Sequence, residues 1–153
     1  MPCPLGRIAT FPLVMQTIHI REFEEADREG VIALWDLAFT GDPPRNAPEL
    51  VIERKLDTQR ELFLVALSKD QLVGTVLGGY DGFRGWAYHL AVHPDHRRAG
   101  IGRKLMQALE IRLRALGCPK VNLQIRATNG EVRAFYEALG YQTEDRISMG
   151  KAF

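Results

Sequence analysis

The chain has 153 residues, with 20 lysines and arginines, 19 aspartates and glutamates, and a formal net charge of +1. Hydrophobic residues make up 46% of it and charged residues 25%, which suits one folded domain and shows no charge excess that would favour nucleic acid or a membrane. Its two cysteines, Cys3 and Cys118, form neither a disulfide framework nor a metal-binding spacing. We therefore expect a cytoplasmic protein that binds a small molecule, with no nucleic acid and no membrane as partners.

Residues 1–16 precede the first convincing strand signal. They hold an apolar stretch that Pro12 interrupts, and no small-residue cleavage pattern follows it. We expect an extension outside a compact domain of residues 17–153, and not a signal peptide.

The first half of this domain predicts one strand, two helices and an antiparallel meander. Residues 17–23 are rich in β-branched side chains, which favours a strand, and apolar residues recur at helical spacing from Val31 to Ala38. Prolines end that helix, and Pro48 begins a second helix that reaches Leu56. Short apolar runs separated by turns predict strands over residues 62–67, 72–78 and 86–92.

The second half predicts a long helix, a strand, a shorter helix and a last strand. Apolar residues keep the 3.6-residue period from Ile101 to Leu116. Alternation over residues 120–126 predicts a strand that runs parallel to the one before it, because a helix connects the two. A helix from about Asn129 to Leu139 and a strand over residues 141–149 complete a β-α-α-β-β-β-α-β-α-β order.

The stretch from residue 88 to residue 102 is the most informative about function. A strand breaks at His93-Pro94 and reaches Arg97-Arg98-Ala99-Gly100-Ile101-Gly102 where a helix begins. Two glycines one residue apart let backbone N–H groups converge, and the start of a helix adds partial positive charge. The two arginines suit phosphate oxygens. Alone, the pattern fits a diphosphate site and an ordinary strand-to-helix turn equally well.

Two common phosphate-binding motifs are excluded. A P-loop needs Gly-Lys-Ser/Thr, but Gly102 is followed by Arg103-Lys104-Leu105. The dinucleotide fingerprint needs a third glycine where Leu105 stands, and the connection from Val92 to Gly100 is too long for its tight turn. We therefore expect neither ATP nor a Rossmann cofactor.

Two motifs on neighbouring elements resemble those of the GNAT family of N-acetyltransferases. The first, Arg/Gln-x-x-Gly-x-Gly/Ala, is met by Arg97, Gly100 and Gly102. The second is an asparagine, a tyrosine seven residues later and a following glycine-aromatic pair, met by Asn129, Tyr136, Gly140 and Tyr141. The resemblance covers residues 17–149 and implies the GNAT fold, a mixed α/β fold with a twisted, mostly antiparallel sheet and helices on both faces. Residues 53–56, 78–82 and 116–120 are similar to a small bacterial branch, the YpeA-type proteins related to ribosomal-protein alanine acetyltransferases.

The resemblance implies that acetyl-CoA is the cosubstrate and that a primary amine is the acceptor, either a protein or peptide N-terminus or a small molecule. The pantetheine would lie along the strand backbone of Leu90, Ala91 and Val92. Asn129 would bond the pantetheine arm, although its position equally favours a helix N-cap. The diphosphate would be held by the residues where the helix begins, which are Arg97, Arg98, Ala99, Gly100, Ile101, Gly102, Arg103 and Lys104.

Tyr136 and His89 are the residues expected to carry the chemistry. The resemblance implies that Tyr136 contacts the cosubstrate and protonates the departing CoA thiolate as a general acid; core packing is the alternative. His89 alternates with Ala87 and Ala91 on one face of its strand, and its intrinsic pKa suits a base that deprotonates the amine. A purely structural histidine, a water relay and three carboxylates stay open as alternatives: Glu22, Glu53 and Asp81.

Other features leave the acceptor open. Four aromatic residues are candidates for an acceptor pocket: Trp35, Tyr80, Phe83 and Trp86. Residues 39–49 form the natural acceptor-side loop. No metal is expected, since His93 and His96 lack a third ligand at suitable spacing. A non-catalytic acyl-CoA sensor is the alternative function. A homodimer, paired through the last strands or the amino-terminal extension, is a further open question.

Overall fold

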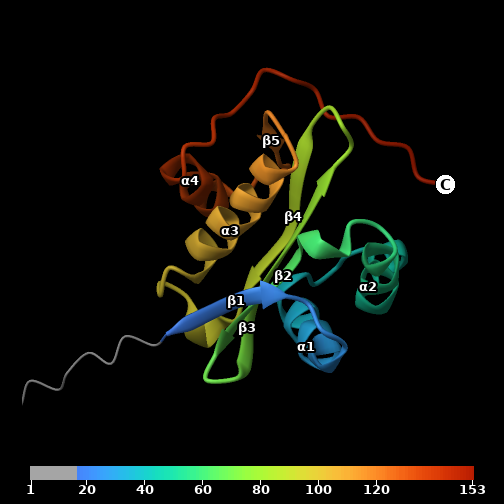
Figure 1. Ribbon diagram of the computed structural model, residues 1–153. Helices are drawn as coiled ribbons and strands as arrows, with labels where there is room; N and C mark the ends of the chain where they lie inside the picture. Colours follow the sequence, from blue (N-terminus) through green and yellow to red (C-terminus); the bar gives the residue numbers. More distant parts are fainter. Residues whose placement is uncertain (1–16) are drawn as a thin grey trace, which may run out of the picture.

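The computed structural model describes residues 17–153, so the extension expected at residues 1–16 lies outside the described residues. Figure 1 shows a central sheet with helices on both sides. The strands lie in the order β1-β2-β3-β4-β5; the first four pair antiparallel, and β5 runs parallel to β4. The helices and strands are β1 (Ile18–Glu22), α1 (Arg28–Ala38), α2 (Pro48–Leu56), β2 (Phe63–Ser68), β3 (Gln71–Tyr80), β4 (Gly85–Val92), α3 (Ile101–Ala115), β5 (Val121–Asn122) and α4 (Gly130–Ala138). The predicted mixed α/β fold is confirmed, and so is the order of elements as far as α4.

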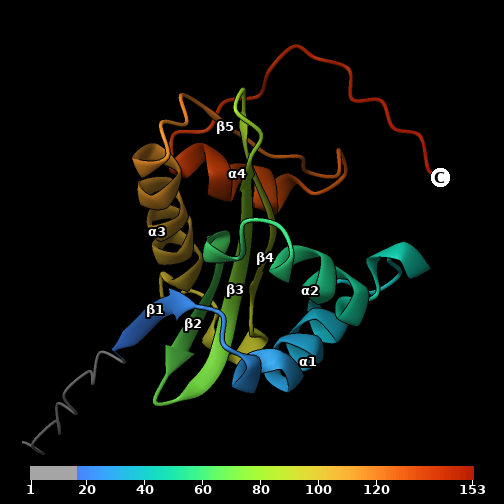
Figure 2. The same ribbon diagram turned by 45° about the vertical axis from the view of Figure 1, so that its right-hand side comes forward.

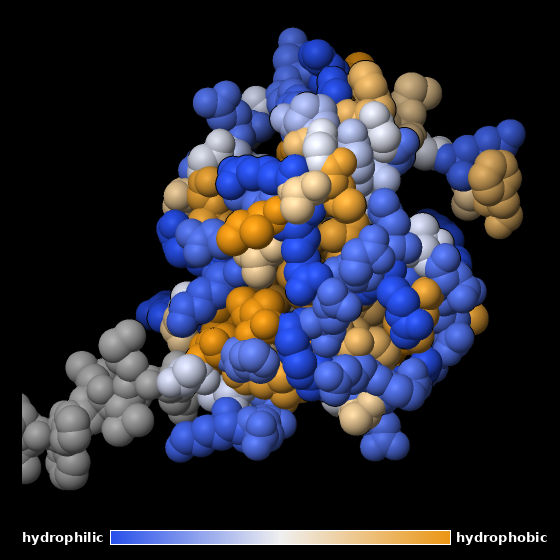
Figure 3. Space-filling model, in the orientation of Figure 1, coloured by the Kyte–Doolittle hydropathy of each residue, from blue (hydrophilic) through white to orange (hydrophobic). Residues whose placement is uncertain are grey.

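Alternation along β2 explains why both faces of the sheet are covered. Leu64 and Ala66 join the core beneath α3, whereas Phe63 and Val65 join the core beneath α1 and α2. Figures 1 and 2 show α3 and α4 on one side of the sheet and α1 and α2 on the other. In Figure 3, hydrophobic patches in the middle of the molecule are bordered by hydrophilic side chains.

The prediction of a last strand over residues 141–149 is wrong, because the structure gives this segment no strand. Side-chain hydrogen bonds connect it to the segment around β5: Lys120 lies 2.6 Å from Glu144, and Gln124 donates to Ser148 over 2.6 Å. The preceding strand, β5, is also shorter than the predicted 120–126. Alternation in this region reflects half-buried side chains that contact the α3 core, and such contacts do not require a ladder.

β4 contains a β-bulge near its centre. Between the paired residues Tyr88 and Ala91, two residues, His89 and Leu90, lie opposite the single residue Val76 of β3. His89 has φ 51°, in the left-handed region that non-glycine residues occupy at a cost. Bulges bend a strand and re-aim its side chains, so this position needs support from its surroundings.

Across the bulge, the alternation of β4 side chains between the two faces of the sheet shifts by one residue. Ala87 lies in the core beneath α3, whereas Ala91 lies in the core beneath α1. The expectation that His89 shares one face with both alanines is therefore wrong. An extra residue in a strand shifts the two-residue period by one, which no pattern in the sequence announces.

A buried hydrogen-bond chain holds the bulge against α1. Trp35 Nε1 donates to Thr75 Oγ1 over 2.8 Å, and Thr75 Oγ1 donates to the backbone oxygen of His89 over 3.1 Å. Trp35 and Thr75 are 1% and 0% exposed, so water cannot replace either bond without opening the core. These two hydrogen bonds connect α1, β3 and the left-handed residue of β4, His89.

The Thr75→Val variant should lower the free energy of unfolding by about 1–3 kcal/mol, because it leaves the buried indole N–H of Trp35 unsatisfied while keeping the side-chain shape. Thermal or urea unfolding measures this. Thr58→Val, the same change at an exposed site, is the control and should be nearly neutral. Equal stability of the two variants would show that the hydrogen bonds from Trp35 through Thr75 to His89 do not stabilise the fold.

Candidate functional site

β4 and β5 diverge directly beyond their first paired residues. Their parallel pairing is limited to Gly85 with Val121 and Trp86 with Asn122. From Tyr88 onward, no described strand covers this edge of β4. Free backbone groups along a strand edge can pair with the amides of an extended ligand. The three residues expected to bind pantetheine, Leu90, Ala91 and Val92, lie on this open edge.

The expected diphosphate site is formed by residues 97–104, which we call the cradle. Gly100 is the N-cap of α3 with φ 75°, and the backbone of Arg98 is also left-handed, with φ 66°. These conformations turn the chain sharply, so that it delivers the first N–H groups of a 15-residue helix to one place.

Four cations of the cradle are free to bind an anion. Arg97, Arg98, Arg103 and Lys104 are exposed, and none of them forms an ion pair or a side-chain hydrogen bond within residues 17–153. Most arginines outside the cradle form an ion pair or a side-chain hydrogen bond, as Arg112 does with Glu22. Unpaired guanidinium groups beside a helix N-terminus fit the oxygens of a diphosphate.

The remaining cradle residues contribute backbone and spacing. Ala99 is exposed, whereas the side chain of Ile101 is 1% exposed and anchors the start of α3 in the core. A Cβ on Gly102 would lie 3.1 Å from the ring of Phe135, so glycine lets α4 approach α3 closely here. Ile101 can therefore reach an anion only through its backbone.

Asn129 caps α4, so the N-cap role, one of the two roles expected for it from the sequence, is confirmed. Its Oδ1 accepts a hydrogen bond from the N–H of Val132 over 3.3 Å. The cap leaves the amide nitrogen of this exposed side chain without a partner among the described residues, so a hydrogen bond from that nitrogen to pantetheine is compatible with the cap.

Tyr136 lies in the core, but its hydroxyl has no hydrogen-bond partner among the described residues. Its side chain is 9% exposed and lies edge-on to Phe135 and Tyr141, with ring centroids 5.0 and 5.7 Å away. Burial raises its pKa to about 12, so the phenol keeps its proton at neutral pH. No group in the described part of the chain hydrogen-bonds to this hydroxyl, which leaves it for a ligand.

His89 lies on the wall of a cavity of about 320 Å³ between α1 and the loop to α2, which we call the acceptor cavity. Its ring lies edge-on to Trp35 and to Phe39, each with centroids 4.8 Å away. Burial lowers the pKa of His89, and the nearby carboxylate of Asp42 partly offsets this. Asp42 is itself paired with Arg126 over 3.3 Å, which connects the loop to the chain beyond β5.

Of the four aromatic candidates for an acceptor pocket, only Trp35 lines this cavity. The expected acceptor-side loop, residues 39–49, supplies much of its wall, including Pro43. Phe83 lies instead 68% exposed in the hairpin turn between β3 and β4. The sequence alone does not show which face of a sheet an aromatic side chain covers.

The three carboxylates kept as alternative bases are engaged elsewhere. Glu22 accepts from Arg112 over 2.5 Å, and Glu53 accepts from Arg28 over 2.7 Å. Asp81 accepts the N–H groups of the β3–β4 turn, which lowers its pKa. None of the three lines the acceptor cavity.

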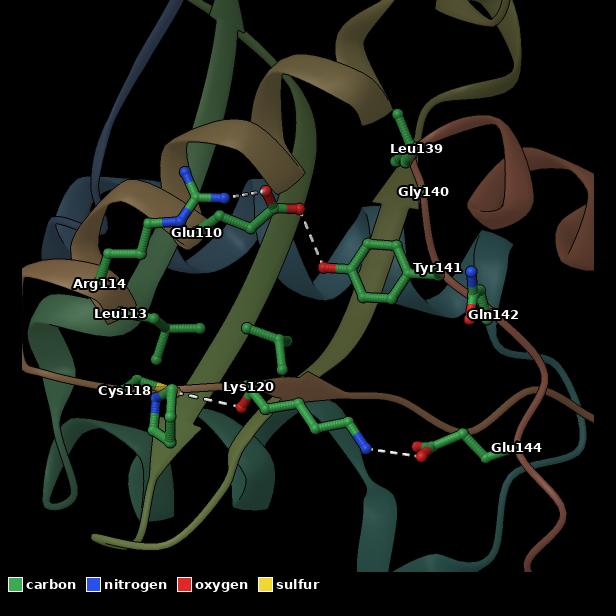
Figure 4. Close-up of a pocket in the computed structure, with 12 residues that line it drawn as sticks. Glu110, Leu113, Arg114, Cys118, Lys120, Leu139, Gly140, Tyr141, Gln142 and Glu144 are labelled. Carbon is green, nitrogen blue, oxygen red and sulfur yellow. Dashed lines mark hydrogen bonds and ion pairs between the residues drawn. The ribbon is translucent and has the colours of Figure 1, made fainter.

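A second cavity, of about 400 Å³, lies between α3, β5 and residues 139–144 (Figure 4). Its polar groups bond to one another: Tyr141 donates to Glu110 over 2.9 Å, and Lys120 donates to Glu144 over 2.6 Å. Such internal pairing leaves few groups for a charged ligand, in contrast to the cradle.

The described residues offer no metal site. The rings of His93 and His96 are 5.9 Å apart, but no three metal-ligating side chains come together between residues 17 and 153. Within the same span, no helix is long and apolar enough to cross a membrane.

Sequence reasoning missed Thr75 and Lys55. Thr75 sits in an apolar strand with no sign of its role, whereas Lys55 carried a readable signal. It follows Val51 and Ile52 at helical spacing on the buried face of α2, where an apolar residue is the norm.

The model of the acetyltransferase (GNAT) family matches residues 24–141. The chain belongs to this family. Acetyltransferase YE1169 of Yersinia enterocolitica is 49% identical to this acetyltransferase over 134 residues, which cover 88% of this chain and 94% of the relative. The family assignment confirms the expected activity, transfer of an acetyl group from acetyl-CoA to an amine.

Solved structures agree with this acetyltransferase in fold. Ard1 from Thermoplasma volcanium has a TM-score of 0.72 and 27% identity, covering 80% of this chain and 81% of its own. The PaiA N-acetyltransferase from Thermoplasma acidophilum, solved in complex with coenzyme A, has a TM-score of 0.74 and 20% identity, covering 86% and 93%. The second likeness is one of fold alone.

The Arg97→Gln variant should bind acetyl-CoA about 10-fold more weakly, because one charge-assisted contact to the diphosphate is lost. Calorimetry measures the dissociation constant. S-acetylpantetheine lacks the diphosphate, so its affinity should not change, and Arg60→Gln, an exposed arginine outside the cradle, should behave as the wild type. Equal losses for both ligands would contradict the assignment of the cradle.

Proposed function

We propose that this acetyltransferase binds acetyl-CoA along the open edge of β4, with the diphosphate in the cradle, and receives a primary amine through the acceptor cavity. The divergence of β4 and β5 after Trp86, on the strand that leads to the cradle, carries the proposal. One continuous path then joins residues that resemble the family's pantetheine and diphosphate contacts. The bulge brings His89 to the same point of β4 from the side of α1.

His89 and Tyr136 approach this path from opposite faces of the sheet. His89 contacts Trp35 of α1, and Tyr136 belongs to the core beneath α3. An amine that enters from the α1 side can therefore attack the thioester carbonyl while the sulfur departs toward α4. A bond forms between the nitrogen and the acetyl carbon, the carbon–sulfur bond breaks, His89 accepts a proton from the nitrogen and Tyr136 donates one to sulfur.

The raised pKa of Tyr136 sets a condition on this step. A phenol with a pKa of about 12 is a weaker acid than a thiol in water, whose pKa is near 8.5. Proton transfer from this phenol to an aqueous thiolate therefore has an unfavourable free energy. Burial, however, disfavours every anion, so the environment that raises the pKa of the phenol also raises that of a thiol beside it. Proton donation is then less unfavourable when the CoA sulfur is held in the same buried place.

Acceptor amines of two kinds fit the cavity, a peptide or protein N-terminus and a small-molecule amine. Aromatic and proline walls would hold an apolar body, and the carboxylate of Asp42 lies near the histidine that would take the proton. A non-catalytic acyl-CoA sensor is the alternative, and the unengaged hydroxyl of Tyr136 argues against it.

The protein's surroundings are also part of the proposal. The near-neutral net charge supports a cytoplasmic protein that binds neither nucleic acid nor membranes. Ile147 and Met149, 91% and 92% exposed, support pairing of two copies through the carboxyl-terminal segment.

The Tyr136→Phe variant should lower kcat by about 10²- to 10⁴-fold while leaving acetyl-CoA affinity nearly intact, because only the proton of the general acid is removed. Thiol release across a panel of amines and peptides measures turnover. Tyr141→Phe, the same change on a neighbouring ring, should keep its turnover. Wild-type turnover in the first variant would remove Tyr136 from the acid role, and acetyl-CoA binding without thiol release from any amine would favour the sensor.

The pH dependence of kcat/KM tests the base. Burial holds the pKa of His89 below its ordinary value of 6.5, and a base works only when deprotonated. Activity should therefore fall as pH drops through a value below 6.5 and stay level above it until other groups titrate. Asp42→Asn should move this acid limb to lower pH, because it removes the charge that raises the pKa of His89.

The His89→Gln variant should lose the acid limb together with most of its rate. His19→Gln, an exposed histidine on β1, is the matched control and should keep both. If the limb persists unchanged in His89→Gln, another group or a water relay serves as the base.

A further inference from the structure

Lys55 is a buried cation on the α2 face that points toward β4. Its side chain is 4% exposed, and it occupies a helix face shared with Val51 and Ile52, both of which are buried. Lysine is almost never fully buried unless a partner compensates its charge. The position therefore needs an explanation beyond packing.

The partners of Lys55 leave the ammonium incompletely satisfied. Its Nζ donates to the backbone oxygen of Gly78 on β3, and it lies 6.0 Å from the ring centroid of Tyr88 on β4. No carboxylate between residues 17 and 153 forms an ion pair with it; Glu61, in the turn before β2, acts on it only at longer range. An ammonium has three donors, so at least one N–H awaits a strong acceptor.

Lys55 is connected to the proposed acceptor site through Tyr88, although neither residue lines the acceptor cavity itself. Tyr88 directly precedes the bulge residue His89, and their ring centroids are 6.0 Å apart. The ring of Tyr88 is thus close to both the ammonium and the histidine, and Tyr88 itself is 41% exposed. A flexible lysine stem and a partly exposed ring allow the ammonium to meet a ligand on this side of β4.

We infer that Lys55 determines acceptor specificity by binding a carboxylate, so that the acceptor is a primary amine carrying a carboxylate a few bonds away. The inference rests on the proposed function and names the chemical class of its acceptor. A carboxylate supplies the acceptor atoms that Lys55 lacks, and its binding would place the amine near His89. The ligand is either a small amino acid or an acidic peptide, which share this chemistry.

Burial strengthens the case by making the charge of Lys55 responsive to a ligand. It lowers the pKa of Lys55 from 10.5 to about 8, against a smaller rise due to Glu61. Lys55 is therefore mostly protonated at pH 7 and mostly neutral at pH 9. The groups facing it are the carbonyl of Gly78, the phenol of Tyr88 and the distant Glu61. Preference for a carboxylate should thus be present below pH 8 and fade above it.

Acceptor pairs that differ only in carboxylate or carboxamide test the inference. Amino acids and their amides probe a small acceptor, and peptides with Glu or Gln at the second position probe a peptide acceptor. At pH 7 the wild type should favour the carboxylate member of one pair about 10- to 100-fold in kcat/KM. Equal rates within both pairs would overturn the inference while leaving acetyl transfer itself established.

The Lys55→Met variant, which keeps the stem but removes the charge, should bring this ratio close to one. Lys69→Met, the same change in the exposed β2–β3 turn, should keep the wild-type ratio. A structural role for Lys55 would lower both rates together and preserve the ratio. A role as base would lower both rates and change the pH profile of both acceptors, and either result contradicts carboxylate recognition.

A binding measurement on the wild-type protein tests the inference without turnover and without the Lys55→Met variant. NMR of protein with ¹³C-labelled lysine, with CoA present, follows the titration of the Lys55 Cε signal. Propionate should move its midpoint upward, because a bound carboxylate favours the ammonium, whereas propionamide should not. An unchanged midpoint with saturating propionate would overturn the inference even if no acceptor in the panel is acetylated.

Discussion

The hydrogen-bond chain from Trp35 through Thr75 to the carbonyl of His89 is the interaction on which the site depends. It fixes a left-handed residue in the middle of β4, where an uninterrupted ladder would be more stable. Strain at this position persists because a fully buried hydroxyl and indole would lose their partners if the strand straightened. The fold thus stabilises a defect in its own sheet.

Two features of the candidate site adjoin that defect. Bulges increase local twist and bend, and β4 stops pairing with β5 after Trp86, before the bulge is reached. The strand edge beyond is open where the cradle begins. With the extra residue, His89 and Ala91 both face α1, while Leu90 and Val92 pack against the core beneath α3. An open edge for one substrate and a cavity for the other therefore meet at the bulge.

Charge is distributed over the site in a way that suits two substrates. The cradle keeps unpaired cations in solvent, where they can meet a diphosphate at little desolvation cost. Lys55 keeps a cation in the interior, where a single anionic partner has a much larger effect. The first arrangement suits tight binding of a common cosubstrate, and the second suits discrimination among acceptors.

Local patterns in the sequence were sufficient to predict the order of elements as far as α4 and the glycine turn that begins α3, because helix period, turn residues and a glycine spacing each act over a few neighbours. They could not predict the bulge, since the residues that hold it, Trp35 and Thr75, are forty positions apart. They also placed His89 on the same face as Ala87 and predicted a last strand that does not form. Pairing and register depend on contacts between distant segments, which a single sequence does not display.

A crystal structure of the protein with CoA bound tests the central claim most directly. We expect the pantetheine beside Leu90, Ala91 and Val92 on the open edge of β4, the diphosphate among the cradle residues, and His89 still held in the bulge by Thr75. CoA bound in the cavity near Glu110 and Tyr141, or a β4 that straightens when CoA binds, would contradict it.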